Sequence, residues 1–384
     1  MPFCESSWCL SQRELIINKR MKEEAMFRKE LKKINAYKPG KPIEEVKRSL
    51  KLDEVYKLAS NEIPFPPSYI RKAIAEEVKN ISRYPESSSF YLRKALAKKL
   101  KVKGDQIVFG NGSDELITLA LKALISKGDE VVVAYPTFLI YEIQAKIAGA
   151  KVIKVPLKNL RYSLSEIAKG VSKKTKIIFI ANPDNPTGTY LSEKEVKDFL
   201  AKIPKRVLVF FDEAYFEFAP GDFPQTLKLL KKRGNIIVTR TFSKAYGLAG
   251  LRIGYGVTTK ELAGILNKIR EPFNINRFAQ VAALAALKNK EFLKKVTAHI
   301  RNEKKYFYQE LKRCKLSFTE SATNFVLVDF KRDSSKLCDY LLKRGVIIRG
   351  LKGWGLKNFF RVTVGLSCEN KKFIKCLQSY LKSN

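Results

Sequence analysis

The sequence predicts an α/β fold in which a mostly parallel sheet is covered by helices on both faces. Short apolar runs recur along the chain, and each is followed by a segment with helical periodicity. This alternation is typical of a parallel sheet whose two faces are both buried. A chain of 384 residues is also long enough to form two domains. We therefore expect a large domain built on this sheet and a smaller α/β domain toward the C-terminus.

The strands of the large domain are expected where apolar runs lie between turn signals. In chain order they are at residues 106–109, 130–134, 151–155, 176–180, 206–211, 235–239 and 252–257. Helices are expected between them, for example at residues 114–126, 137–148 and 192–203. A long helical pattern at residues 277–313 leads into the second domain. There we expect strands at residues 324–330, 345–349 and 359–364, alternating with helices at residues 334–344 and 370–382.

The most informative residue is Lys244, which follows the apolar run at residues 236–238 and lies where a strand ends and a loop begins. A lysine amine can form a Schiff base with an aldehyde cofactor, and pyridoxal phosphate (PLP) is the usual one. Ser243 and Arg252 lie close by, and a hydroxyl with a guanidinium can hold the phosphate of this cofactor. Among 74 lysines and arginines a solvated surface lysine is the ordinary case, so the assignment depends on two further segments.

Two upstream segments supply the remaining groups of such a site. Asp212 closes the buried run at residues 207–211, which places it at the carboxyl end of a parallel strand, where open α/β sheets bind ligands. A carboxylate there can pair with the protonated pyridine nitrogen of PLP; the alternative is that Asp212 caps the next helix. Asn185 follows another buried run, residues 177–180, in a turn marked by Asn-Pro and Thr-Gly. Asn185 and Tyr215 can both donate to the phenolate O3′ of the cofactor.

Three motifs together resemble those of the fold-type I PLP-dependent aminotransferases. They are Asn-Pro-Asp-Asn-Pro-Thr-Gly at residues 182–188, Asp-Glu-Ala-Tyr at 212–215 and Ser-Lys at 243–244. More narrowly, the chain is similar to the histidinol-phosphate aminotransferases, a class-II branch of that family. The segments that carry the narrower resemblance are residues 37–40, 57–62, 83–85, 110–115 and 360–365. The resemblance runs from about residue 37 to the C-terminus and implies a large PLP-binding domain with a smaller C-terminal domain.

The resemblance implies a role for each matching residue around the cofactor. Lys244 would be the Schiff-base lysine and the acid/base that moves a proton between substrate Cα and cofactor C4′. The other cofactor-binding residues would be Asp212 at the ring nitrogen, Asn185 and Tyr215 at O3′, Ser243, Arg252, Ser113 and Asp114 at the phosphate, and Phe138 against the ring. An ordinary place in the core is the alternative for Phe138. Tyr84 would reach the phosphate from the partner subunit, which would make the active enzyme a homodimer.

On the substrate side, the resemblance assigns Arg361, Arg349 and Tyr37 to an anionic tail that is a phosphate ester. A surface position is the alternative for Arg349. The implied reaction is transamination of L-histidinol phosphate with 2-oxoglutarate, which gives imidazole acetol phosphate and glutamate in histidine biosynthesis. Three alternatives stay open. They are a threonine-phosphate decarboxylase, an aromatic amino acid aminotransferase on the same scaffold, and nucleic-acid binding driven by the net charge of +36.

The chain departs from the family pattern at one place. After Asn61 and Glu62 the pattern continues Asn-Pro-x-Gly-Pro, whereas residues 63–67 read Ile-Pro-Phe-Pro-Pro. We expect this difference to alter the loop over the site, and Pro67 to stiffen it because proline fixes φ. The difference bears on the choice of substrate rather than on the cofactor chemistry.

Composition argues against several other classes of protein. The single histidine, His299, nearly excludes a Ser-His-Asp mechanism and a histidine-rich metal site, so we expect no metal. The six cysteines form no C-x-x-C pair, which predicts reduced thiols in a cytoplasmic protein. The basic residues are scattered along helices instead of gathered in one arm, and no apolar run reaches the roughly 18 residues of a membrane span.

We predict that the PLP-binding domain covers residues 61–270 and that the small domain combines residues 37–60 with residues 271–384. The first 36 residues lie outside the resemblance and are expected to form a poorly ordered N-terminal extension. They hold all three methionines, Met1, Met21 and Met26, and lack the pattern of a signal peptide. One hypothesis is therefore that translation begins at Met21 or Met26.

Overall fold

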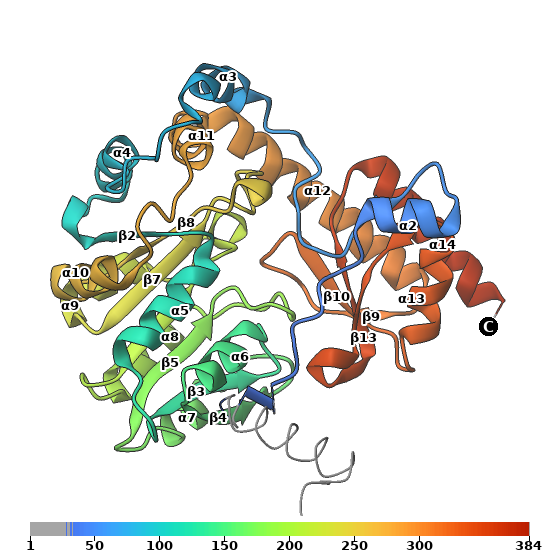
Figure 1. The fold of residues 1–384 in the computed structure, drawn as a ribbon. Coiled ribbons are helices and arrows are strands. Elements are labelled where there is room, and N and C mark those ends of the chain that lie inside the picture. The colour runs from blue at the N-terminus through green and yellow to red at the C-terminus, as the bar shows by residue number, and fades with distance from the viewer. Residues whose placement is uncertain (1–27, 29–30, 33, 384) are drawn as a thin grey trace, which may run out of the picture. The chain divides into compact units, whose positions relative to one another are not determined.

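The computed structural model describes residues 28, 31–32 and 34–383 (Figure 1). Its contacts divide the chain into two units, Met1–Ala36 and Tyr37–Asn384. The predicted N-terminal extension therefore falls almost wholly outside the described residues, and the fold described below is that of the second unit. Within the described residues, no helix has both the length and the apolar character that a membrane span requires.

A seven-stranded sheet forms the centre of the larger part of this unit, in the order β2-β8-β7-β6-β5-β3-β4. Its strands are β2 (Ile107–Gly110), β3 (Glu130–Tyr135), β4 (Lys151–Pro156), β5 (Thr175–Ala181), β6 (Leu208–Asp212), β7 (Ile236–Thr241) and β8 (Gly254–Val257). Every neighbouring pair is parallel except the two that include β8, which runs antiparallel to both β2 and β7. The predicted mostly parallel sheet is confirmed.

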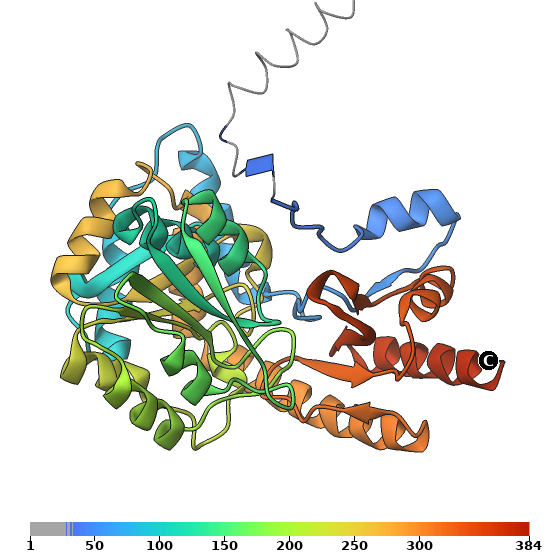
Figure 2. The ribbon, with the colours of Figure 1, turned by 90° about the horizontal axis from the view of Figure 1, so that it is seen from below.

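Helices cover both faces of this sheet, as the view in Figure 2 shows. They are α3 (Arg71–Glu77), α4 (Phe90–Leu100), α5 (Ser113–Leu124), α6 (Ile140–Ile147), α7 (Leu164–Lys169), α8 (Glu193–Lys202), α9 (Thr226–Arg233), α10 (Lys260–Ile269) and α11 (Arg277–Lys288). The central strands β6 and β7 are buried along their whole length, which explains why the sequence shows continuous apolar runs there instead of an alternating pattern.

The long helical pattern at residues 277–313 is two helices instead of one. Helix α11 ends at Lys288, and α12 (Lys290–Arg313) begins after Asn289, whose side chain accepts the backbone N–H of Phe292 at 2.9 Å. Asn is a favoured residue at such a helix start because its side chain satisfies an otherwise unpaired N–H. The alanines of α11 join the core around the large sheet, whereas Val296, Ile300 and Phe307 of α12 join a second core. The chain thus passes from one core to the other at this break.

The second core surrounds a four-stranded sheet in the order β12-β13-β10-β9. Its strands are β9 (Ser317–Phe318), β10 (Phe325–Asp329), β12 (Arg349–Leu351) and β13 (Leu356–Thr363), and they pack with α12, α13 (Ser335–Leu342) and α14 (Ser367–Lys382). The predicted strand at residues 345–349 is split into β11 (Val346–Ile347) and β12. The short strand β1 (Tyr56–Lys57), which follows α2 (Ile43–Leu50), pairs in parallel with β11. Residues near the N-terminus of the unit therefore pack with its C-terminal part.

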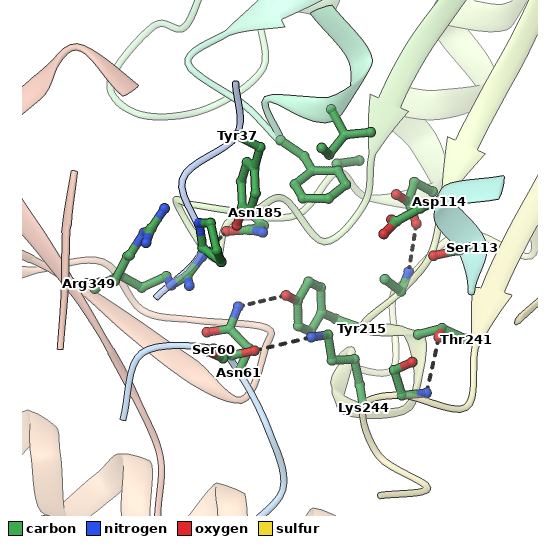
Figure 3. Close-up of a pocket in the computed structure, with 18 of the residues that line it drawn as sticks. Tyr37, Ser60, Asn61, Ser113, Asp114, Asn185, Tyr215, Thr241, Lys244 and Arg349 are labelled. Atoms are coloured by element: carbon green, nitrogen blue, oxygen red, sulfur yellow. Dashed lines mark hydrogen bonds between the residues drawn. The ribbon is translucent and has the colours of Figure 1, made fainter. Parts of the chain in front are cut away.

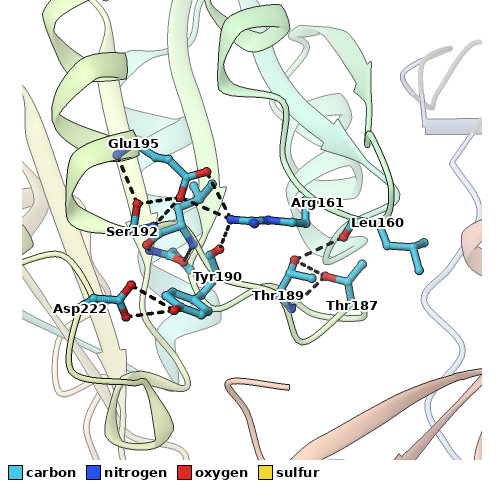
Figure 4. A network of polar contacts seen from close by, with 10 residues as sticks. Leu160, Arg161, Thr187, Thr189, Tyr190, Ser192, Glu195 and Asp222 are labelled. Atoms are coloured by element: carbon cyan, nitrogen blue, oxygen red, sulfur yellow. Dashed lines mark hydrogen bonds and ion pairs between the residues drawn. The ribbon is translucent and has the colours of Figure 1, made fainter. Parts of the chain in front are cut away.

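A network of polar contacts fixes the loop between β5 and α8, which carries Asn185 (Figure 4). Arg161 donates to the carbonyl oxygen of Tyr190 at 3.0 Å and to the carboxylate of Glu195 at 3.2 Å. The same carboxylate accepts the backbone N–H of Ser192 at 2.8 Å and so completes a capping box at the start of α8. The loop that carries Asn185 is therefore anchored at its far end.

Candidate active site

A pocket of about 340 Å³ lies at the carboxyl ends of the central strands and is lined from both sheets (Figure 3). Parallel strands place their carboxyl ends at one edge of a sheet, where ligands of open α/β sheets bind. The predicted residues that line the pocket are Tyr37, Ser113, Asp114, Phe138, Asn185, Asp212, Tyr215, Ser243, Lys244, Arg252, Arg349 and Arg361. Of the predicted site residues, only Tyr84 lies elsewhere.

Lys244 reaches the pocket from the loop that follows β7. The hydroxyl of Thr241, the last residue of β7, accepts the backbone N–H of Ser243 at 3.1 Å and shapes the turn. The Nζ of Lys244 donates to the backbone carbonyl of Ser60 at 3.4 Å. Burial lowers the pKa of Lys244 to about 8, and the positive charge of Arg361 acts in the same direction. A substantial share of this side chain is therefore a neutral amine near neutral pH, which is the form that acts as a nucleophile or base.

Asp212 is the last residue of β6 and is buried at the base of the pocket. Its Oδ2 accepts the hydroxyl of Tyr141 at 2.7 Å, and its Oδ1 accepts the backbone N–H of Ala214 at 3.2 Å. Burial raises the pKa of this carboxyl to about 6, while the bond from Tyr141 opposes the rise. Among the described residues no cation pairs with this carboxylate, and a protonated ring nitrogen would supply one. Tyr141 itself was not predicted, because its position inside an expected helix gives no sign that it contacts Asp212.

Arg361 and Asn185 are in direct contact in the lining of the pocket. One nitrogen of the Arg361 guanidinium, Nη1, donates to Oδ1 of Asn185, and Nη2 donates to the carbonyl of Ala59 at 2.8 Å. Its Nε is buried and has no hydrogen-bond partner among the described residues. A buried guanidinium with an unfilled donor is suited to an anionic group, because charge-assisted bonds to carboxylate or phosphate are strong.

A second group of donors lies where α5 begins. The guanidinium of Arg252 donates through Nη1 to the hydroxyl of Ser243 at 3.3 Å and lies 3.7 Å through Nη2 from Oδ2 of Asp114. Helix α5 starts at Ser113, and Gly112 just before it has a φ of +78°. A Cβ at that position would overlap the Arg252 guanidinium. The glycine therefore lets an arginine approach the free N–H groups of a helix start, which together suit a phosphate.

Aromatic side chains hold the guanidinium of Arg349 in place. The guanidinium of Arg349 lies 4.9 Å from the ring centre of Trp354 and 5.7 Å from that of Tyr37, and it donates to the carbonyl of Lys38 at 2.5 Å. Arg349 therefore lines the pocket and is not the surface cation of the alternative interpretation. Trp354 was not predicted. Phe138 also lines the pocket, with its ring edge-on to Tyr141 at 5.5 Å between centres.

Tyr84 lies outside the pocket on the surface of the unit. Its side chain is 79% exposed and stacks on Phe273 with 4.8 Å between ring centres. This large aromatic surface has no contact with the pocket of its own chain.

The departure at residues 63–67 also lies outside the lining, and none of these described residues contacts the pocket. Ile63 and Phe65 instead pack against the second core, and the Phe65 ring lies edge-on to His299 at 4.8 Å. The apolar side chains of this segment therefore pack against the core beside the pocket, and its effect on the loop over the site stays a prediction.

Comparison with known proteins agrees with this geometry. A model of the family Aminotransferase class I and II matches residues 53–375. A protein of Carboxydothermus hydrogenoformans named histidinol-phosphate aminotransferase 2 is 43% identical over 360 residues, 93% of this chain and 99% of that protein. One of the same name from Haemophilus influenzae is 42% identical over 354 residues, 92% of this chain and 97% of its own. The structure of histidinol-phosphate aminotransferase from Sinorhizobium meliloti in complex with pyridoxal-5′-phosphate has a TM-score of 0.86 and 29% identity, and the match covers 93% of this chain and 98% of that chain. This chain belongs to the class I and II aminotransferases.

Proposed function

We propose that this protein transfers the amino group of L-histidinol phosphate to 2-oxoglutarate with the help of PLP, giving imidazole acetol phosphate and glutamate. The observation that carries the proposal is one pocket that combines Lys244, whose pKa is lowered, with the buried Asp212 and with Arg349 and Arg361. Relatives that are 42% and 43% identical along nine-tenths of the chain bear the name of this activity. The reaction belongs to histidine biosynthesis.

The residues of the pocket fit PLP. A phosphate is suited to the corner of Ser243, Arg252 and the start of α5, which a side chain at Gly112 would fill. The other contacts that we propose are Asp212 at the ring nitrogen, Asn185 and Tyr215 at O3′, Phe138 on the ring face, and Ser113 and Asp114 at the phosphate corner. When bound, PLP supplies an electron sink for the substrate Cα.

Lys244 is the residue that we propose to attach the cofactor and to carry the proton. Freed from the cofactor, its amine would take a proton from the substrate Cα and deliver it to C4′. A pKa of about 8 suits both directions, because a base works best when its pKa lies near the operating pH. The single histidine does not compete for this role, since His299 lies outside the pocket with Nε2 at 2.9 Å from the Gly365 carbonyl.

The lowered pKa of Lys244 leads to a testable prediction about the rate at which the cofactor-free protein takes up PLP. At pH 7.5 about a quarter of Lys244 is expected to be neutral, against about 0.1% for a lysine of ordinary pKa. Stopped-flow measurement of PLP uptake by the cofactor-free protein should give a rate that rises with pH and levels off around pH 8–9. A rate that still rises several-fold between pH 9 and pH 10 would contradict the role of burial.

We propose that the substrate's phosphate is recognised by Arg361, Arg349 and Tyr37. All three line the pocket, and the Nε of Arg361 still lacks a partner among the described residues. The same cations would take the distal carboxylate of 2-oxoglutarate and of glutamate, which follow histidinol phosphate in the same site. Nothing in the lining favours the decarboxylase or the aromatic alternative over this substrate.

The proposal is tested in two half-reactions on purified protein loaded with PLP. Histidinol phosphate is added first, and the visible absorption of the cofactor should decrease; 2-oxoglutarate is added next, and glutamate should form as the absorption returns. Threonine phosphate and phenylalanine serve as parallel substrates. Release of CO₂ from threonine phosphate, or a preference for phenylalanine, would replace the proposed substrate, while a protein that takes up no PLP would overturn the cofactor.

We further propose that the enzyme is a homodimer in the cytoplasm, with Tyr84 completing the phosphate site of its partner. The support for the dimer is a set of exposed large apolar side chains in the same part of the sequence as Tyr84 or in contact with it. They are Val78, Ile81, Phe90, Tyr91 and Phe273. Ile81 and Phe273 line one surface hollow together with Tyr84, and exposed apolar side chains that gather in this way are typical of an interface between proteins. The cytoplasm is supported by the cysteines of the described part, which are all free.

Mixed dimers provide a prediction for this arrangement. The Tyr84→Ala and Lys244→Ala proteins should each be strongly impaired alone. When the two are expressed together, half of the dimers are mixed, and each mixed dimer has one site with both residues intact. Activity should therefore recover to about a quarter of the wild-type level. If the mixture stays as inactive as its parents while size-exclusion chromatography shows dimers, Tyr84 does not serve the partner's site.

We also propose the division of the chain into a large domain, residues 61–270, and a small domain, residues 37–60 with 271–384. The pairing of β1 with β11 and the separate second core support it. Helix α11 is the element at the border, because it belongs to the second segment by sequence and packs on the first core.

A further inference from the structure

We propose that Asn61 is a positioning residue that directs the hydroxyl proton of Tyr215 into the pocket, toward O3′ of the bound cofactor. The inference rests on the proposed function for the identity of that cofactor. It concerns a residue that the sequence motifs did not single out for this task, and it follows from a chain of hydrogen bonds between the two sheets (Figure 3).

The first step is the contact between Asn61 and Tyr215. The Nδ2 of Asn61 donates to the hydroxyl oxygen of Tyr215 at 2.7 Å. The hydroxyl therefore accepts on the Asn61 side and must donate its own proton in another direction. Burial raises the pKa of Tyr215, so the hydroxyl stays protonated. Its ring packs edge-on against Phe325 with 5.4 Å between centres, and among the described residues nothing else is bonded to the hydroxyl.

The second step is the orientation of the Asn61 amide, which Thr363 decides. The hydroxyl of Thr363 accepts the backbone N–H of Asn61 at 2.9 Å and donates its proton to Oδ1 of Asn61 at 3.2 Å. If the amide were turned over, Oδ1 would face Tyr215 and the hydroxyl proton of Thr363 would lose its acceptor, at a cost of about 1–3 kcal/mol. The hydroxyl of Thr363 thus keeps the donor of the amide on Tyr215.

The third step is the backbone of Asn61, which allows both contacts. Its φ of +57° lies in the left-handed region, which asparagine tolerates better than most residues. The backbone N–H and the side chain can therefore both reach Thr363. The carbonyl of Asn61 accepts the Nδ2 of Asn324 at 3.0 Å, and the side chain of Asn61 is only 2% exposed. Thr363 is the last residue of β13, and Asn324 directly precedes β10. Residues of the smaller sheet therefore orient, through Asn61, the hydroxyl of Tyr215, which follows a strand of the larger sheet.

The test uses two substitutions of Asn61 in protein loaded with PLP. Asn61→Asp has nearly the same shape but replaces the donor by an acceptor, so the Tyr215 proton should turn toward the carboxylate and leave O3′. Asn61→Gly removes the side chain and tolerates the same φ. The visible absorbance is titrated against pH. We expect the midpoint to rise by roughly 0.5–1 pH unit in Asn61→Asp and by less in Asn61→Gly, because the anionic O3′ loses a hydrogen bond.

The control is Asn61→Asp in a protein that lacks the Tyr215 hydroxyl. In a Tyr215→Phe background, Asn61→Asp should shift the midpoint by less than about 0.2 unit, because there is no proton left to redirect. A shift of equal size in that background would mean that the added charge acts directly, and would overturn the inference. An unchanged midpoint in Asn61→Asp alone would overturn it as well.

Thr363→Val supplies a second variant if Asn61→Asp fails to fold. It removes the hydroxyl that orients the amide but keeps the branched shape, so the midpoint should move in the same direction by a smaller amount. Thermal unfolding of the cofactor-free variants measures any structural cost separately. A protein that takes up no PLP would refute the proposed function instead, so the two failures are distinguishable.

Discussion

Replacing Lys244 by alanine is expected to reduce kcat on the order of 10⁴-fold. A large loss is expected because one side chain is proposed to have two tasks, attachment of the cofactor and transfer of the proton between Cα and C4′. Single-turnover measurement with histidinol phosphate gives the rate. Borohydride reduction of the loaded wild type, followed by digestion, should place the cofactor's mass on the peptide that contains Lys244, and the variant should carry none.

Lys304 offers a matched control for this experiment. Burial also lowers its pKa to about 8, and its Nζ donates to the carbonyl of Ser321, but it lies outside the pocket. Lys304→Ala should therefore keep activity within about threefold of wild type, since it removes an equally perturbed lysine without touching the chemistry. Comparable losses in both variants would mean that Lys244 acts through stability and not through the reaction.

Asp212→Asn is expected to lower kcat by roughly 10²–10³-fold, which corresponds to about 3–4 kcal/mol. A neutral amide cannot hold the proton on the ring nitrogen, so the ring would withdraw electrons less strongly. Steady-state kinetics at saturating PLP measures the loss. Tyr141→Phe is the milder companion, because it removes only the hydrogen bond to Oδ2 and leaves the charge. A full-rate Asp212→Asn enzyme would contradict the assignment of this carboxylate.

The Asp212→Asn substitution that lowers kcat is expected to raise the stability of the cofactor-free protein. The pKa of Asp212 is about 6 in the folded state against 3.8 ordinarily, so between about pH 4 and 6 the folded state binds more protons than the unfolded state. The free energy of unfolding therefore decreases as the pH rises through this window. Asp212→Asn removes that decrease and should make the cofactor-free protein more stable at pH 7, by about 1–3 kcal/mol. Denaturant unfolding at pH 4 and pH 7 would show it.

An Asp212→Asn variant that is less stable than wild type at pH 7 would contradict the effect of burial. A variant that is more stable and yet inactive would show that the carboxylate is kept for the reaction at the expense of the fold. The two measurements together separate loss of chemistry from loss of structure.

Much of the site is predictable because the motifs are local. Asp212 and Lys244 each follow a buried run, and parallel pairing then brings the ends of those strands to one edge. The break at Asn289 is harder to predict, since both α11 and α12 have the same helical period and asparagine also occurs inside helices. The place of residues 63–67 was likewise not visible, because an apolar loop packs on whichever core lies next to it.

By itself, the sequence determined the α/β fold and pointed to Lys244 as the proposed reactive lysine, because periodicity and short motifs act over a few residues. Only the tertiary structure decided which groups meet across the two sheets. Asn61 bonds to Thr363, 302 residues away, and Arg361 to Asn185, 176 residues away. Burial by these distant segments also sets the pKa of Lys244 and of Asp212. Desolvation depends on everything that surrounds a group, and so no local pattern can specify it.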